Sequence, residues 1–435
     1  MARALLCCLA GCSKPLQPLP EQSIRPLLGV QDWIREDHFE QAKRRPSSPY
    51  QTALVAYRFN AWTYAEMDPA SRRVGSVREG RVVWGKAEAS HRGCPEGWYA
   101  LAQGGYACAS GSFRRVDDEA AEARDLTPAL DRALPYDYVQ VTRGAARYDR
   151  IPSADEECRL GSADTAPGAP LDRRMDGDFF LAVAAREEDH GRSFYRTLRD
   201  KYVHVEEVTS LPHSQLHGKK DPALPIAFVL EPDTPLLSLG DGATREIGRA
   251  ERYSTFPLDR MVTRAQQRYA VDPQGRAAPA SAVRVVRPLA RPAEVGPGEK
   301  WIVVDLSDQT LVAYEGDRPV LATLVSSGRE GHETPTGSFR IRTKYVSKTM
   351  RGEDPADGPY EVHEVPWTMY YNGAYALHGA YWHDEFGHVK SHGCTNLAPA
   401  DARWLLRWTD PPLPAGWHSI LSEGAHAGTR VFFVP

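Results

Sequence analysis

Glycine and proline interrupt this chain so often that long helices have little room. Its 435 residues include 35 glycines and 34 prolines. Short runs of β-branched and aromatic residues lie between them, for example Gly80-Arg-Val-Val-Trp84. Such residues fit a pleated surface, whereas Gly and Pro favour turns. The pattern therefore predicts a mainly β protein made of several modules, and a hydrophobic share of 42% is enough to fill their cores.

The charge balance argues against a nucleic-acid partner. The formal net charge is -4, with no basic excess to meet a phosphate backbone. No apolar run is long enough to span a bilayer.

A membrane signal is nevertheless expected at the start of the chain. Arg3 precedes a short apolar stretch, and Leu9-Ala10-Gly11-Cys12 resembles the lipobox of bacterial lipoproteins. The resemblance implies a signal at 1–12, lipidation of Cys12, a Pro-rich tether at 13–50, and anchoring in the periplasm or cell envelope. Eleven residues are short for such a signal, which leaves open a start upstream of Met1. The alternative is a chance apolar N-terminus on a cytoplasmic protein.

The remaining cysteines have different expected roles. Cys94 and Cys108 lie in one compact segment and could close a β-hairpin as a disulfide in an oxidising compartment. Cys158 has no evident mate and is expected to be a buried thiol. Cys394 has neighbours that a structural cysteine does not need.

Three modules are expected before the last domain. Residues 51–115 resemble a small bacterial SH3-type barrel, 134–215 are expected to form a second such module, and 222–286 are β-rich. A Pro- and Gly-dense linker follows at 287–298. Two roles stay open for these modules: spacers that position the last domain, or binding of wall glycan or peptide.

Residues 299–435 are expected to form a separate β domain. Strands are predicted at 300–305, 309–314, 320–326, 338–343, 366–371, 375–378 and 429–434. Pro399–Trp408 is the one clear helix, with proline in its first turn.

The chemistry is expected in the segment from His378 to Asn396. A thiol attacks carbonyl groups only as a thiolate, and a nearby imidazole can take its proton. His378 ends a predicted strand, and the chain can turn back to bring Cys394 to it. Gly393 permits a tight turn, so the amides of Gly393 and Cys394 are expected to be free to form an oxyanion hole.

These residues resemble the L,D-transpeptidase catalytic domain family. Its signature is a His, a variable loop, and Ser-His-Gly-Cys followed two positions on by Asn or Arg. Here the match is His378, Ser391-His392-Gly393-Cys394 and Asn396, with Gly328 and Thr334-Pro-Thr-Gly337 upstream. The resemblance covers residues near 300 to 435 and implies a C-terminal β-sandwich with its site in a groove.

The resemblance also implies roles for these residues. Cys394 is the nucleophile and His378 its base, and His392, Gly393 and Cys394 line the oxyanion site. Ser391 and Asn396 hold the loop or touch substrate. Asn396 stands where other members carry Arg, which puts a carboxylate contact there in doubt.

The groove around these residues has further candidate members. Trp382 and Tyr370 could form its walls. The Gly- and acid-rich segment 350–364 is expected to be either a solvated surface loop or a flap over the groove.

The family's reaction implies a peptidoglycan substrate. The thiolate attacks the amide after the L-centre of diaminopimelate in a tetrapeptide stem and releases D-Ala. An amine of a neighbouring stem then takes the acyl group, which gives a 3-3 cross-link. Water or a protein amine as acceptor gives a carboxypeptidase or attachment of a protein to the wall, and the sequence does not choose among them.

Two other classes of function compete with this interpretation. His378, His383, His388, His392 and Cys394 could hold zinc, but their spacing matches none of the usual ligand patterns, so no metal or cofactor is predicted. A non-catalytic wall-binding lipoprotein is the other alternative. Degenerate members usually lose the nucleophile, whereas Cys394 is present here.

Overall fold

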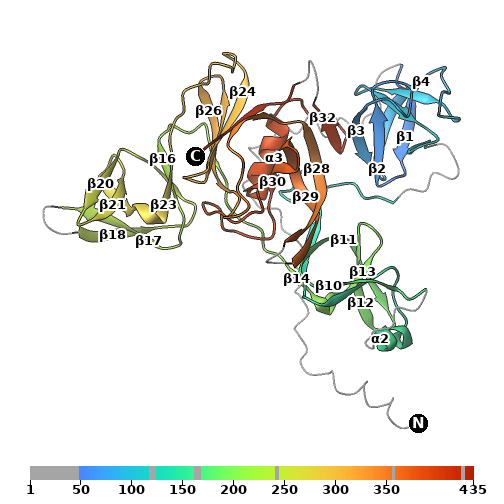
Figure 1. Ribbon diagram of the computed structural model, residues 1–435, viewed down its shortest axis with the longest axis horizontal. Helices are drawn as coiled ribbons and strands as arrows, with labels where there is room; N and C mark the ends of the chain where they lie inside the picture. Colours follow the sequence, from blue (N-terminus) through green and yellow to red (C-terminus); the bar gives the residue numbers. More distant parts are fainter. Residues whose placement is uncertain (1–48, 117–123, 161–167, 241–243, 355–357, 423–426) are drawn as a thin grey trace, which may run out of the picture.

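The computed structural model describes residues 49–116, 124–160, 168–240, 244–354, 358–422 and 427–435. It confirms the mainly β fold (Figure 1). Cys12, the 1–12 signal and most of the 13–50 tether lie outside the described residues. In the part of the chain described, no helix is both long enough and apolar enough to cross a membrane.

The C-terminal region is a sandwich of two sheets that share the long strand β26. One sheet runs β15-β26-β25-β24-β33-β27, and the other runs β26-β31-β30-β29-β28-β32. The C-terminal β-sandwich that the sequence predicted is therefore confirmed. Its strands are β24 (Lys300–Asp305), β25 (Thr310–Glu315), β26 (Arg318–Ser326), β27 (Gly337–Arg340), β28 (Thr343–Asp354), β29 (Gly358–Asn372), β30 (Tyr375–Gly379), β31 (Thr395–Leu397), β32 (Ser419–Leu421) and β33 (Arg430–Val434).

Helix α3 (Pro399–Trp408) has the bounds predicted from the sequence. Pro399 starts it, where a missing N–H costs nothing. Leu405 and Leu406 are fully buried in the core between the sheets, together with Leu377 of β30. Each buried leucine contributes about 1.5–3 kcal/mol. The helix therefore packs behind the strand that carries His378.

The first module forms a seven-stranded sheet in the order β7-β1-β4-β5-β6-β2-β3. Cys94 and Cys108 form a disulfide within it. Its edge strand β3 pairs with the C-terminal domain, because Gly75 of β3 lies opposite Ile420 of β32. The strands are β1 (Thr52–Ala56), β2 (Asn60–Tyr64), β3 (Arg73–Arg78), β4 (Val82–Ala87), β5 (Trp98–Leu101), β6 (Tyr106–Cys108) and β7 (Phe113–Arg115).

The second module also joins the C-terminal domain through a strand. Asp178 to Phe180 of β11 pair in parallel with Tyr360 to Val362 of β29. Cys158 lies on helix α2 (Ala154–Leu160) and is exposed, so the buried thiol was a wrong prediction. The strands are β8 (Asp137–Val141), β9 (Ala145–Tyr148), β10 (Leu171–Met175), β11 (Asp178–Asp189), β12 (Arg192–Thr197), β13 (Tyr202–His204) and β14 (Val208–Ser210), with the 3-10 turn η3 (Val205–Glu207).

The third module has two small sheets of its own, β19-β16-β23 and β18-β17-β22-β21-β20. It contacts the loop between His378 and Cys394 through side chains: Arg252 pairs with Asp384, and Arg284 Nε donates to the Gly387 carbonyl at 2.9 Å. The strands are β16 (Ile226–Val229), β17 (Thr234–Leu239), β18 (Thr244–Ala250), β19 (Thr255–Pro257), β20 (Arg260–Arg264), β21 (Gln267–Val271), β22 (Arg276–Pro279) and β23 (Val283–Val286), with η4 (Ala280–Ala282). The short strand β15 (Lys219–Lys220), which precedes this module, pairs with β26 of the C-terminal domain.

The segment 350–364 is not a surface loop. Its described residues belong to the long hairpin of β28 and β29, with Met350 opposite Val362. The second module pairs with the outer part of this hairpin. The base of the hairpin receives a buried salt bridge from the first module, in which Arg78 Nη2 lies 2.6 Å from Glu364 Oε2. Two modules thus contact this hairpin, whose strands belong to the same sheet as β30 and β31.

Candidate active site

Two parallel strands bring His378 and Cys394 to the same place. His378 of β30 lies opposite Asn396 of β31, and Cys394 directly precedes β31. The Ala376 backbone N–H, two residues before His378, faces the Cys394 sulfur. Because side chains two apart on a strand share a face, His378 and Cys394 lie diagonally across one strand pair. This register brings Cys394 back to His378, as expected from the sequence.

The Cys394 thiol is half-buried and held by backbone groups. Its S–H donates to the Ala374 carbonyl across 3.6 Å. Burial raises the pKa of the thiol to about 11, and the Ala376 N–H opposes this shift. The sulfur is therefore a neutral thiol near pH 7.

His378 is a buried neutral imidazole, 2% exposed. Its Nδ1 lies 3.2 Å from the Gly379 carbonyl oxygen. A carbonyl only accepts, so Nδ1 carries the hydrogen and Nε2 keeps its lone pair. Burial lowers the pKa of His378 to about 4, with the Gly379 carbonyl opposing the shift. The residue is thus oriented as a proton acceptor through Nε2.

The two side chains do not form a resting ion pair. Within the described residues, the hydrogen bonds of His378 and Cys394 go to backbone carbonyls rather than to each other. The pKa directions, downward for the imidazole and upward for the thiol, keep the proton on sulfur. The thiolate expected from the sequence is therefore not the resting form of Cys394. Catalytic hydrogen bonds are often long before substrate binds.

The turn before Cys394 is fixed by side-chain hydroxyls. Gly393 has a φ of 109°, and a Cβ there would lie 2.6 Å from Tyr375 Cε1. Its N–H donates to Ser391 Oγ at 3.0 Å, while Ser391 Oγ donates to the Cys394 carbonyl. Thr334 Oγ1 donates to the Gly393 carbonyl at 2.8 Å and accepts from the Gly328 N–H at 2.9 Å.

This turn corrects one prediction about the oxyanion hole. The Gly393 amide was expected to be free, but it is bonded to Ser391 Oγ. The two upstream motif residues, Gly328 and Thr334, are brought to the same turn as Cys394. Ser391 is 7% exposed and lies within the turn, where it holds the loop in shape.

His392 points away from the turn into an aromatic cluster. It is exposed, and its ring stacks on Tyr360 with centroids 5.2 Å apart. Its Nε2 lies 3.1 Å from Arg329 Nη2, and the His332 ring is 5.0 Å away. Tyr360 belongs to the β28–β29 hairpin. The side chain of His392 therefore links the cysteine loop to the hairpin.

Asn396 is buried against His383 rather than turned to a groove. It is 3% exposed, and its amide lies 2.8 Å from His383 Nε2. His383 Nδ1 accepts from the Glu385 N–H, so Nε2 must carry the hydrogen. This N–H needs an acceptor, and the Asn396 amide oxygen has no other hydrogen-bond partner among the described residues. The amide oxygen of Asn396 therefore faces His383 Nε2. His383 and Asn396 therefore form a supporting pair behind His378.

Trp382 and Tyr370 lie on two sides of the site. The Trp382 ring is 5.7 Å from His378 and 6.1 Å from Phe180 of the second module. Tyr370 lines a cavity of about 290 Å³ with Arg342, Thr343, Tyr345, Asn372 and Gly373. Burial raises the pKa of Tyr370. Tyr370 pairs with Ala376 across β29 and β30, and the Ala376 N–H faces the Cys394 sulfur.

The histidines proposed as alternative zinc ligands are dispersed. Within the described ranges, no three His, Cys, Asp or Glu side chains are grouped so that they could hold a metal ion. His388 and His392 are exposed, whereas His378 and His383 are buried.

Sequence reasoning missed the residues that support the site from other modules. Arg78 and Glu364 are 286 positions apart, yet each is buried at the base of the hairpin. Tyr138 OH donates to the Glu364 carbonyl at 2.8 Å. A single arginine in a short strand carries no local signal of such a partner.

Comparison with known proteins identifies the C-terminal domain. Residues 299–432 match the YkuD family model, described as the L,D-transpeptidase catalytic domain. This confirms the resemblance seen in the sequence for that part of the chain. A search of curated proteins found no match.

Solved structures give a weaker likeness. A mutant Enterococcus faecium L,D-transpeptidase is 25% identical, with 31% of this chain and 50% of that chain covered and a TM-score of 0.25. The catalytic domain of the E. faecium L,D-transpeptidase is also 25% identical. The match covers 32% of this chain and 98% of that domain, with a TM-score of 0.25. An L,D-transpeptidase from Mycobacterium smegmatis is 18% identical. The match covers 40% of this chain and 82% of that chain, with a TM-score of 0.25. This chain thus spans about half the length of the first of these. The family match and the site geometry carry the argument.

Proposed function

We propose that this protein is a peptidoglycan L,D-transpeptidase that acts through an acyl-enzyme at Cys394. The observation that carries the proposal is the parallel register of β30 and β31, which sets His378 and Cys394 diagonally on one strand pair inside a domain that matches this family. The proposed donor is a tetrapeptide stem, and the proposed acceptor is a diaminopimelate amine of a second stem.

The chemistry follows from the two neutral side chains. Sulfur attacks the amide carbon while its proton moves to Nε2 of His378, and the S–C bond forms. The C–N bond then breaks, and His378 returns the proton to the departing D-Ala amine. In the second half, the acceptor amine attacks the thioester and loses its proton to His378. The S–C bond breaks and the sulfur regains that proton.

The backbone around sulfur supports this sequence of steps. The Ala376 N–H already faces the sulfur and favours its charged form. The Gly379 carbonyl holds the His378 tautomer that leaves Nε2 free to accept. A fixed tautomer and fixed donors reduce reorganisation during reaction. We propose further that the protein works in the periplasm or cell envelope, anchored through Cys12.

The test uses isolated sacculi incubated with the full chain, digested and analysed by mass spectrometry. New diaminopimelate-to-diaminopimelate dimers are expected, and Cys394→Ala should abolish them. Cys158→Ala is the matched control, because that thiol lies on α2 in another module. Shortened stems or wall-linked protein in place of dimers would replace the proposed acceptor by water or a protein amine. Equal product from Cys394→Ala and the parent would refute the enzyme and favour a non-catalytic wall-binding protein.

A further inference from the structure

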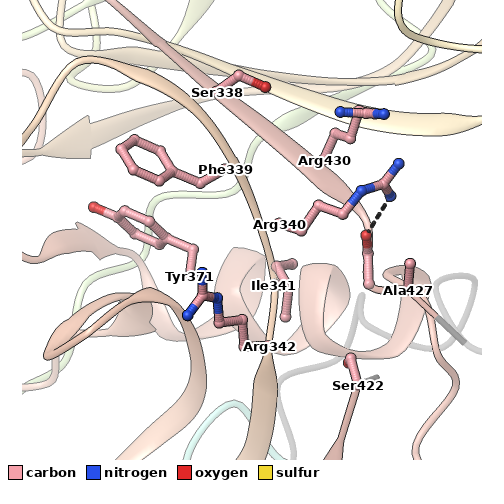
Figure 2. A pocket seen from close by; sticks show the side chains of 10 residues that line it. Ser338, Phe339, Arg340, Ile341, Arg342, Tyr371, Ser422, Ala427 and Arg430 are labelled. Carbon is pink, nitrogen blue, oxygen red and sulfur yellow. Dashed lines mark hydrogen bonds between the residues drawn. The ribbon is translucent and has the colours of Figure 1, made fainter. Parts of the chain in front are cut away.

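An arginine-lined cavity opens beside the catalytic sheet. It has a volume of about 380 Å³ and lies between the end of β27, the start of β33 and the segment at 427–428 (Figure 2). Arg340, Arg342 and Arg430 line it, with Tyr371 and Ser338. Arg340 of β27 and Arg430 of β33 extend to one side of β27, whereas Arg342, from the segment between β27 and β28, lies beside Tyr371 (Figure 2).

The positive charge of this cavity is only partly balanced. Arg340 and Arg430 are direct cross-strand partners, an arrangement in which like charges repel. A single carboxylate serves both: Glu299 Oε1 lies 3.2 Å from Arg340 Nη2 and 3.5 Å from Arg430 Nε. Arg340 Nη1 also donates to the Gly428 carbonyl at 2.8 Å, drawn as the dashed line in Figure 2.

Arg342 adds a third positive charge without a carboxylate. It is exposed, and it forms no ion pair with any residue that the structure describes. Among the described residues, Glu299 is the carboxylate that pairs with both Arg340 and Arg430, and Arg342 pairs with none. Such a site favours an incoming anion.

Arg342 also connects this cavity to the catalytic centre. It lines the smaller cavity that contains Tyr370 and Gly373 as well as the arginine-lined one. Gly373 directly precedes Ala374, whose carbonyl accepts from the Cys394 thiol. Tyr371 lines the arginine-lined cavity, and its neighbour Tyr370 pairs with Ala376, whose N–H faces the Cys394 sulfur. The two spaces therefore adjoin at Arg342, and the smaller one lies next to the nucleophile.

We propose that Arg342, supported by Arg340 and Arg430, binds a carboxylate of the peptide substrate away from the bond that reacts. This rests on the proposed function. A guanidinium fork matches a carboxylate geometrically, and it remains charged at any physiological pH. An acidic stem peptide with its acyl group at Cys394 would place a second carboxylate along the adjoining cavities. Inorganic phosphate is the other anion that the same groups could take.

The test compares two forms of one donor, a tetrapeptide stem whose diaminopimelate carboxylate is free or amidated. For Arg342→Gln, the KM for the free carboxylate should rise about tenfold, the factor expected from losing one charge-assisted hydrogen bond. The KM for the amidated donor and both kcat values should not change. Arg287→Gln removes an exposed arginine that lines neither cavity and is paired with Asp308, so it is the matched control.

Two further measurements make the outcome decisive. Equal KM changes for the free and amidated donors would overturn the proposal, as would no change for either. Inhibition by inorganic phosphate that disappears in Arg342→Gln, with the peptide KM values unchanged, would assign the site to a free anion and also overturn it. Intact mass reports acylation of Cys394 separately. If every variant is acylated at Cys394 and the KM values are equal, only the carboxylate site is contradicted. If the parent protein is not acylated, the proposed function itself is contradicted.

Discussion

Two buried groups of titratable side chains lie on adjacent strands of this protein and are treated in opposite ways. At the base of β29, Glu364 keeps its charge: burial alone would raise its pKa, but Arg78, His418 and Ser347 outweigh burial and hold it at about 2. On β30, His378 has no such counter-charge, and burial lowers its pKa to about 4.

The difference teaches what burial does to a group with and without a partner. A buried ion pair is costly to break, because one charge is then left in a low-dielectric interior. A buried group without a counter-charge becomes neutral instead. The first arrangement holds the modules together at the hairpin. The second keeps the imidazole and the thiol neutral until substrate arrives.

The largest effect should come from removing the proton acceptor. We expect His378→Gln to lower turnover about 10²–10⁴-fold, because glutamine cannot take the thiol proton. His383→Gln is the matched control, since it changes the same residue type behind the site and should lower turnover much less. Rates of dimer formation measure both. Equal losses would mean that packing, not proton transfer, explains the first variant.

The next effect concerns the charged cluster. Arg78→Met should lower the free energy of unfolding by about 3–5 kcal/mol, because Glu364 is left buried without its main partner. The Glu364 side chain is 3% exposed, so water cannot take the place of the lost arginine. Urea unfolding measures the loss, and the double change Arg78→Met with Glu364→Gln should recover part of it. A loss below about 1 kcal/mol, typical of a surface pair, would remove the contrast between the two groups.

The smallest effect is a pH dependence that sharpens the neutral-pair interpretation. The pKa of Cys394 is raised to about 11, so the thiol stays protonated below that pH and its thiolate fraction grows as pH rises. In a Cys158→Ala background, the rate of alkylation of Cys394 by iodoacetamide should increase steadily from pH 6 to 10. A plateau between about pH 5 and 8 would instead indicate a thiolate–imidazolium pair.

Much of the catalytic domain could be predicted because its signals are local. The continuous apolar run at 301–304 and the proline that begins the 399–408 segment define a strand and a helix within a few residues of sequence. The spacing of His378 and Ser391-His-Gly-Cys394 indicates the same chemistry as the geometry. By contrast, the Gly393 amide was misjudged, because its direction depends on where Ser391 Oγ lies after the turn has formed.

The sequence by itself determined the β character, helix α3 and the residues proposed to carry the chemistry, since periodicity and motif spacing act over short stretches of chain. Only the tertiary structure decided that β3 joins β32 and that β11 joins β29. The same holds for the pairing of Arg78 with Glu364 and for the pairing of both Arg340 and Arg430 with Glu299. Strand pairing between distant segments depends on which buried surfaces fit together, and a pKa depends on the burial that results. Neither the strand pairing nor the pKa can be predicted from the residues adjacent in sequence.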